Sequence, residues 1–134
     1  MLLLQISLNN FGPFEGEHKI RLFCSDVESE HKPVRIIGGL NGSGKSSVLE
    51  AVRLCLHGRQ SLGNPTAADY QRHIYERFHC RPDGWRSENA HVELEILIVE
   101  NGLERTYRIT RSWSAKTKNT ILDLWDITNL RILH

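Results

Sequence analysis

The chain has 134 residues, 40% of them hydrophobic and 25% charged, which are ordinary proportions for a soluble globular protein. This composition argues against a disordered chain and against a membrane span. Seventeen Lys and Arg residues oppose sixteen Asp and Glu residues, so the net charge of +1 indicates no particular partner. We expect one domain over residues 1–134, because this length suits a single hydrophobic core.

The first predicted elements are strands. Apolar residues occupy every second position across residues 2–8, the period of a strand with one buried face. Gly12 and Gly16 interrupt this pattern, and the alternation returns over residues 18–24. The branched run at residues 34–37 predicts a central strand that leads into a glycine-rich loop.

The period then becomes helical from Lys45 to His57, and Gly58 is placed to end the helix. The predicted buried stripe consists of Val48, Val52 and Cys55, backed by Leu49, Ala51 and Leu56. Glu50 and Arg53 are predicted to face water. A second short helix is predicted over residues 67–78, where Tyr70, Ile74 and Phe78 recur every four residues.

Three strands follow in the second half of the chain. Residues 91–99 and 104–113 alternate and are separated by Asn101-Gly102, the dipeptide that best suits a two-residue hairpin turn. Residues 120–126 alternate again. We therefore predict an antiparallel sheet for this half.

Residues 39–46 match the phosphate-loop pattern G-x-x-x-x-G-K-[ST] at every fixed position. Glycines let successive backbone N–H groups converge on phosphate oxygens, and the start of the following helix favours an anion. The motif requires a hydrophobic strand before it and an amphipathic helix after it, and the pattern predicts both. The alternative is a glycine-rich turn that binds nothing.

The phosphate loop assigns a role to each of its polar residues. Lys45 is the predicted catalytic residue and contacts the β- and γ-phosphates. Ser46 ligates Mg²⁺, and Ser47 hydrogen-bonds the α-phosphate. The predicted binding residues of the loop are Gly39, Asn41, Gly42, Ser43, Gly44, Lys45, Ser46 and Ser47.

Three separate segments resemble SMC-like ATPases, the branch of the ABC-type ATPases that includes SbcC, RecF and RecN. They are residues 8–16 (LNNFGPFEG), 41–51 (NGSGKSSVLEA) and 107–111 (YRITR). Within this branch, the doubled Gly38-Gly39 and residues 54–58 and 70–74 look most like DndD, the SMC-like ATPase of bacterial DNA phosphorothioation systems.

This resemblance implies a fold class, a cofactor and partners. The fold would be α/β, the N-terminal lobe of an ABC-type P-loop ATPase head with a mainly antiparallel β lobe. The cofactors would be ATP and Mg²⁺, although the residues alone do not separate ATP from GTP. The partners would be DNA, a second ATPase head in a homodimer, and other DNA-modification subunits, with no membrane.

Two features of the motifs limit what the resemblance transfers. Many relatives carry Arg or Lys after the Asn-Phe pair, where Gly12 stands here, so only backbone groups of Phe11 and Gly12 are expected near the nucleotide. The glutamine, signature and acidic pair of ABC-type hydrolysis, which follow a long coiled coil in the family, are not found. We therefore expect a first lobe that holds phosphates but does not hydrolyse ATP alone.

Other functions remain open at this point. One alternative is an SbcC-type DNA repair ATPase that works with a nuclease. A small-molecule P-loop kinase usually begins with the phosphate-loop strand, whereas a hairpin comes first here. Transporter ATPases of the ABC type typically carry a glutamine well beyond the phosphate-loop lysine. No glutamine follows Gln71 here, so a transporter ATPase is disfavoured.

The remaining chemical residues indicate no second site. Cys24, Cys55 and Cys80 lack metal-ligand spacing, which favours free thiols in a reducing cytoplasm. Packing is the expected role of Trp85, Trp113 and Trp125. Residues 104–118 carry five basic residues and one acid, which is either a solvated strand face or a DNA phosphate contact; the basic residues are Arg105, Arg108, Arg111, Lys116 and Lys118.

Overall fold

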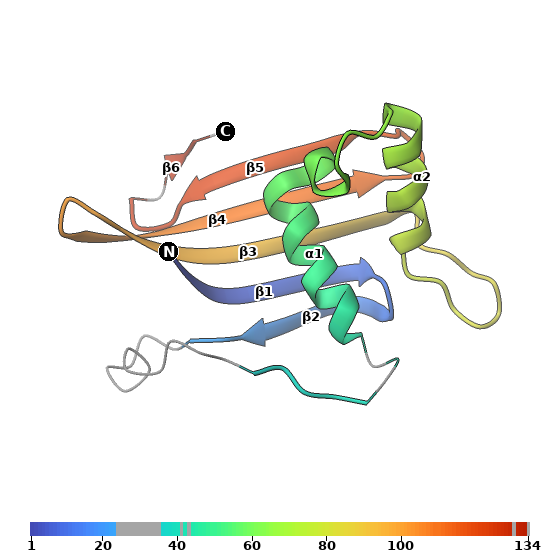
Figure 1. The fold of residues 1–134 in the computed structure, drawn as a ribbon, viewed down its shortest axis with the longest axis horizontal. Helices are drawn as coiled ribbons and strands as arrows, with labels where there is room; N and C mark the ends of the chain where they lie inside the picture. Colours follow the sequence, from blue (N-terminus) through green and yellow to red (C-terminus); the bar gives the residue numbers. More distant parts are fainter. Residues whose placement is uncertain (24–35, 41, 43, 130, 134) are drawn as a thin grey trace.

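The computed structural model describes residues 1–23, 36–40, 42, 44–129 and 131–133. Its centre is a six-stranded sheet in the order β2-β1-β3-β4-β5-β6 (Figure 1). The strands are β1 (Leu2–Phe11), β2 (Phe14–Arg21), β3 (Asn89–Glu100), β4 (Leu103–Ser114), β5 (Thr120–Asp126) and the two-residue β6 (Arg131–Ile132). The helices are α1 (Lys45–His57), the 3-10 helix η2 (Gly58–Leu62) and α2 (Ala67–Arg77).

Helix α1 crosses one face of the sheet, and α2 lies by the ends of β3 and β4 (Figure 1). None of the described helices is long and apolar enough to span a membrane. The predicted bounds of α1 are confirmed, with Gly58 in a left-handed conformation at its end. Thr66 caps the start of α2, where its side chain accepts a hydrogen bond from the Asp69 backbone, and the helix ends one residue earlier than predicted.

The strand predictions are confirmed for most of the chain. Asn101 and Gly102 both have positive φ, at 52° and 77°, as a tight hairpin turn between β3 and β4 requires. The turn between β1 and β2 is shorter than the sequence suggested, because Phe11 already pairs with Phe14. Of the predicted second strand, Cys24 lies outside the described residues.

The predicted central strand at residues 34–37 is not supported where the structure describes it. Residues 34 and 35 lie outside the described ranges, whereas Ile36 and Ile37 belong to no strand, and Ile36 is 91% exposed. Branched side chains favour a strand only where neighbours pair with it and cover it. Neither condition is met by a described strand at this point.

The predicted α/β class needs the same correction. Every pairing between described strands is antiparallel, and the described helices cover one face of the sheet. This is the layered arrangement of an α+β domain. The expectation of a mainly antiparallel lobe agrees with it.

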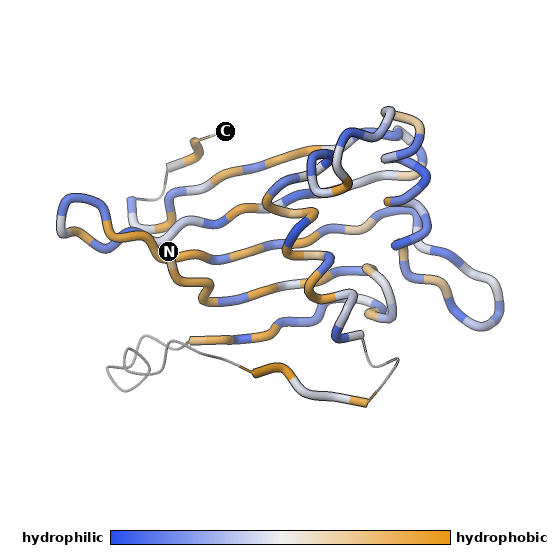
Figure 2. Tube along the Cα trace, viewed as in Figure 1, coloured by the Kyte–Doolittle hydropathy of each residue, from blue (hydrophilic) through white to orange (hydrophobic). Residues whose placement is uncertain are grey.

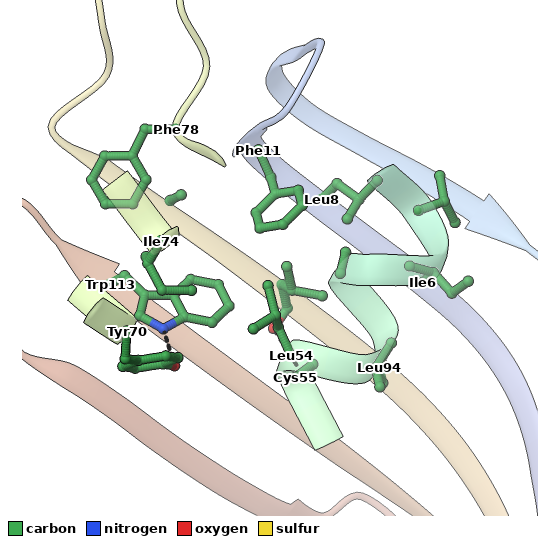
Figure 3. Packing of buried hydrophobic residues seen from close by; sticks show 14 residues of the cluster. Ile6, Leu8, Phe11, Leu54, Cys55, Tyr70, Ile74, Phe78, Leu94 and Trp113 are labelled. Carbon is green, nitrogen blue, oxygen red and sulfur yellow. Dashed lines mark hydrogen bonds between the residues drawn. The ribbon is translucent and has the colours of Figure 1, made fainter. Parts of the chain in front are cut away.

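The core fills the layer between α1, α2 and the sheet (Figure 3). Strand β3 alternates regularly, and the same alternation is visible along the central strands in Figure 2. Its core-facing residues are Ala90, Val92, Leu94 and Ile96. The alternation fixes which face of the sheet receives α1.

The buried stripe of α1 differs from the prediction. Its buried residues are Val48, Ala51, Leu54 and Cys55, at spacings of three or four, whereas Leu49 is 65% exposed. The predicted stripe is rotated about the helix axis relative to the buried one, because apolar residues occupy more than one side of this segment. Leu54 is fully buried and was missed.

Helix α2 is attached to the sheet through aromatic side chains. Trp113 is buried and donates a hydrogen bond from its indole nitrogen to the Tyr70 hydroxyl at 2.9 Å (Figure 3). The Phe11 ring lies 6.2 Å from the Trp113 ring. The packing role predicted for Trp113 is therefore confirmed, and its ring connects α2 to β1.

Candidate phosphate-binding site

The start of α1 is built to receive an anion. Gly44 is the N-cap with φ of 103°, a left-handed conformation that glycine adopts without strain. Among the described residues no side chain caps the helix, and its first turn contains no acidic residue. The first N–H groups of α1 are therefore left for an external acceptor, with the helix dipole favouring negative charge.

A hollow of about 280 Å³ opens at this helix start. Its volume lies just below that of a typical pocket for a whole ligand, so it suits the phosphate tail of a nucleotide. The lining residues are Pro13, Gly42, Gly44, Lys45, Ser46 and Ser47. Five of these belong to the phosphate loop or to the first turn of α1.

The Lys45 ammonium bends back over the loop and donates a hydrogen bond to the Gly39 carbonyl. This contact holds the ammonium beside the loop. The structure thus brings together Gly39, Gly42, Gly44, Lys45, Ser46 and Ser47 from the predicted binding residues. Asn41 and Ser43 lie outside the described residues.

The β1–β2 turn forms the other wall of the hollow. A Cβ atom on Gly12 would lie 3.0 Å from the Ser47 hydroxyl oxygen, and Gly12 has φ of 57°. A Cβ atom on Gly44 would lie 2.7 Å from the Phe14 ring. Glycine is therefore needed on both sides of this contact, which explains why a longer residue does not occupy position 12.

The predicted site residues did not include two residues of this wall. Pro13 lines the hollow and Phe14 contacts Gly44. The signal was present, because both belong to the segment 8–16 that resembles SMC-like ATPases. The Phe11 side chain is 1% exposed and packs in the core beside Trp113, whereas the prediction concerned its backbone groups and stays a prediction.

Glu50 was predicted to face water, but its carboxylate is hydrogen-bonded to α2. Its carboxylate accepts hydrogen bonds from His73 Nε2 at 2.6 Å and Arg77 Nε at 2.7 Å. Partial burial raises the pKa of the Glu50 carboxyl, but the hydrogen bonds from Arg77 and His73 outweigh burial and leave that pKa below its ordinary value. The carboxylate is therefore held ionised between the two helices.

Two arginines of the basic stretch at residues 104–118 have partners within the domain. Arg108 lies beside Glu93 and Glu95 of the neighbouring strand, at 3.4 and 2.8 Å. Arg111 points toward the helical layer and donates to the Cys55 carbonyl at the end of α1, at 3.0 Å. Both side chains therefore contribute to the packing of this sheet.

The other basic residues of the stretch differ in their surroundings. Arg105 lies 3.7 Å from the Glu100 carboxylate. Lys116 and Lys118 are exposed in the turn between β4 and β5, and neither ammonium forms an ion pair with the part of the chain that the structure describes.

Cys55 and Cys80 are free thiols, and burial raises the pKa of Cys55 to about 12. Within the described ranges, no three His, Cys, Asp or Glu side chains gather as a metal site would require.

Residues 5–133 match the model of a protein family described as an AAA domain. The match includes the whole phosphate loop and the β1–β2 turn. No curated protein matches the chain at a significant level.

Proposed function

Because this chain belongs to the AAA-domain family of SMC- and SbcC-like ATPases, we propose that it binds ATP together with Mg²⁺ at the start of α1. The observation that carries the proposal is the hollow of about 280 Å³ lined by the phosphate loop. Its wall combines uncapped helix N–H groups with one ammonium, which is the chemistry that binds a polyphosphate.

Each site residue has a role in this proposal. Lys45 leaves the Gly39 carbonyl and binds the β- and γ-phosphate oxygens, which develop the most charge during phosphoryl transfer. Ser46 offers its hydroxyl to Mg²⁺, a hard cation that prefers oxygen ligands. Ser47, held under Gly12, is placed to hydrogen-bond the α-phosphate.

The test is a titration of the protein with a fluorescent ATP analogue in the presence of Mg²⁺. We expect Lys45→Ala to weaken binding by at least about tenfold, because a charge-assisted contact to phosphate is lost. Lys19→Ala is the matched control, since Lys19 is an exposed lysine on β2 that is paired with Glu17. Equal affinity in wild type and Lys45→Ala would refute the proposal.

The finer proposal is that this ATPase head acts on DNA in a phosphorothioation system. The supporting features are the DndD-like segments, namely Gly38-Gly39 and residues 54–58 and 70–74. In this setting two heads bind ATP between them, and DNA, a second copy and DNA-modification subunits are the partners in the cytoplasm. Recovery of sulfur-transfer subunits in a pull-down from the native host would support it.

ATP hydrolysis is proposed for the complete two-head assembly. Residues 1–134 contain the phosphate loop but not the glutamine, signature and acidic pair that ABC-type hydrolysis uses. The purified 134-residue chain should therefore bind ATP without turnover. Steady phosphate release that disappears in Lys45→Ala would contradict this division of roles.

One observation favours a DNA repair ATPase as the second candidate. The strand at residues 107–111 reads YRITR, as in SbcC-like heads, and its Arg108 and Arg111 have defined structural roles here. The same pull-down separates the two candidates, because a nuclease subunit would be recovered in place of sulfur-transfer subunits.

A further inference from the structure

Glu50 occupies a central position between the two helices. It lies one helical turn beyond Ser47 on α1, so both residues are on the same side of that helix. His73 and Arg77 are four residues apart on α2 and therefore both face the Glu50 carboxylate. The Glu50 side chain is 28% exposed, so this contact is partly shielded from water.

The end of α2 in turn fixes the β1–β2 turn. The Gly12 N–H donates to the Arg77 carbonyl at 2.6 Å, and the Gly12 carbonyl is hydrogen-bonded to the His79 ring at 2.9 Å. The His79 N–H donates to the Asn10 carbonyl at 2.8 Å. Both the N–H and the carbonyl of Gly12 are therefore hydrogen-bonded to the segment that carries Arg77.

These contacts close a ring through the phosphate site. Glu50 holds Arg77 through its side chain, Arg77 holds Gly12 through its carbonyl, and Gly12 lies against Ser47. Ser47 returns to Glu50 along one turn of α1. Pro13, the next residue of the turn, lines the same hollow as Lys45.

We propose that Glu50 is a positioning residue, which holds the β1–β2 turn over the phosphate pocket through Arg77 and thereby raises nucleotide affinity. This inference rests on the proposed function, because it assigns a support to the same site. Glu50 itself touches no phosphate in this arrangement. Its effect reaches the ligand through the placement of Gly12 and Pro13.

The test compares Glu50→Gln with a matched change in an ion pair elsewhere. Glu50→Gln keeps the shape of the side chain but removes the charge that holds Arg77. Glu95→Gln, on β3, removes the charge of one of the two carboxylates beside Arg108 and is the control. The readouts are the Kd for a fluorescent ATP analogue with Mg²⁺ and the melting temperature of the protein without nucleotide.

We expect Glu50→Gln to raise this Kd about fivefold, a common size for coupling between a site and its support, while Glu95→Gln leaves it unchanged. Arg77→Met, which breaks the contact from the α2 side, should raise the Kd equally. The double variant should bind no more weakly than either single variant, because both act through one contact.

The possible outcomes separate this inference from the function on which it rests. If wild type does not bind the analogue, or if Lys45→Ala binds as well as wild type, both are overturned. If Lys45→Ala loses binding but Glu50→Gln and Arg77→Met bind normally, only the positioning role is overturned. If neither of these two variants folds, the contact serves the fold as a whole and the positioning role is also rejected.

Discussion

Substitution of Gly12 tests the close approach between the β1–β2 turn and the phosphate loop. In Gly12→Ala, the new Cβ atom meets two penalties. The alanine must adopt the left-handed backbone conformation of position 12, with φ of 57°, which costs about 1 to 2 kcal/mol for an L residue. The new Cβ atom also lies 3.0 Å from the Ser47 hydroxyl oxygen and 3.1 Å from the Ser47 Cβ atom. This overpacked contact costs about 1 to 3 kcal/mol.

Gly16 provides a control for the first penalty alone. Its φ is 68°, and a Cβ atom there would have no neighbour within 4 Å. Gly16→Ala should therefore lower the free energy of unfolding by about 1 to 2 kcal/mol, while Gly12→Ala lowers it by about 2 to 5 kcal/mol. Urea unfolding of the two variants, with equal slopes, measures the difference.

A second readout links this packing to the site. Gly12→Ala should also weaken binding of the ATP analogue, because Ser47 must move to accommodate the methyl group. Gly16→Ala should bind it normally. Equal destabilisation by the two substitutions would refute the close contact between Gly12 and Ser47.

Three further predictions concern ionisation and charge. Burial raises the pKa of Cys55 to about 12, so iodoacetamide at pH 8 should modify exposed Cys80 and leave Cys55 unmodified until the protein unfolds; peptide mass mapping checks this. Because the pKa of Glu50 is lowered in the fold, its contribution to stability is complete above the ordinary value of 4.5 and is lost as the pH falls below it. Acid should therefore destabilise wild type more than Glu50→Gln in urea unfolding, and equal loss would contradict this. Neutralising Lys116 and Lys118 in the full protein should reduce the slope of log K for DNA against log salt by up to about 2, whereas an unchanged slope would exclude these lysines from phosphate contact.

Local patterns predicted much of the fold because they reflect local physics. Helix α1 was bounded correctly by the change of period at Lys45 and by Gly58, and the β3–β4 hairpin by Asn101-Gly102. In each case the turn or cap residue has the backbone conformation that its type favours. These elements need no knowledge of distant contacts.

The errors arose where distant contacts decide the outcome. Ile36 and Ile37 have strand-forming side chains, but pairing and burial depend on neighbours that periodicity does not identify. Glu50 was assigned to water because it is charged, and its partners come from a helix more than twenty residues away in sequence.

The candidate site shows the same division. Its loop residues follow a fixed spacing and could be identified from the sequence, whereas the wall formed by Pro13 and Phe14 depends on how a hairpin folds back over Gly44. Hydrogen bonds of Gly12 with Arg77 and His79 hold this hairpin in place, and they could not be predicted from either segment alone.

The most direct measurement is an amide NMR titration of the isotopically labelled chain with a nonhydrolysable ATP analogue and Mg²⁺. If the polyphosphate binds in the hollow, the largest shifts should fall on the amides of Gly44, Lys45, Ser46 and Ser47, with smaller ones at Gly12. Saturating shifts that cluster elsewhere, or no shifts at these amides, would contradict the assignment of a phosphate site to the start of α1.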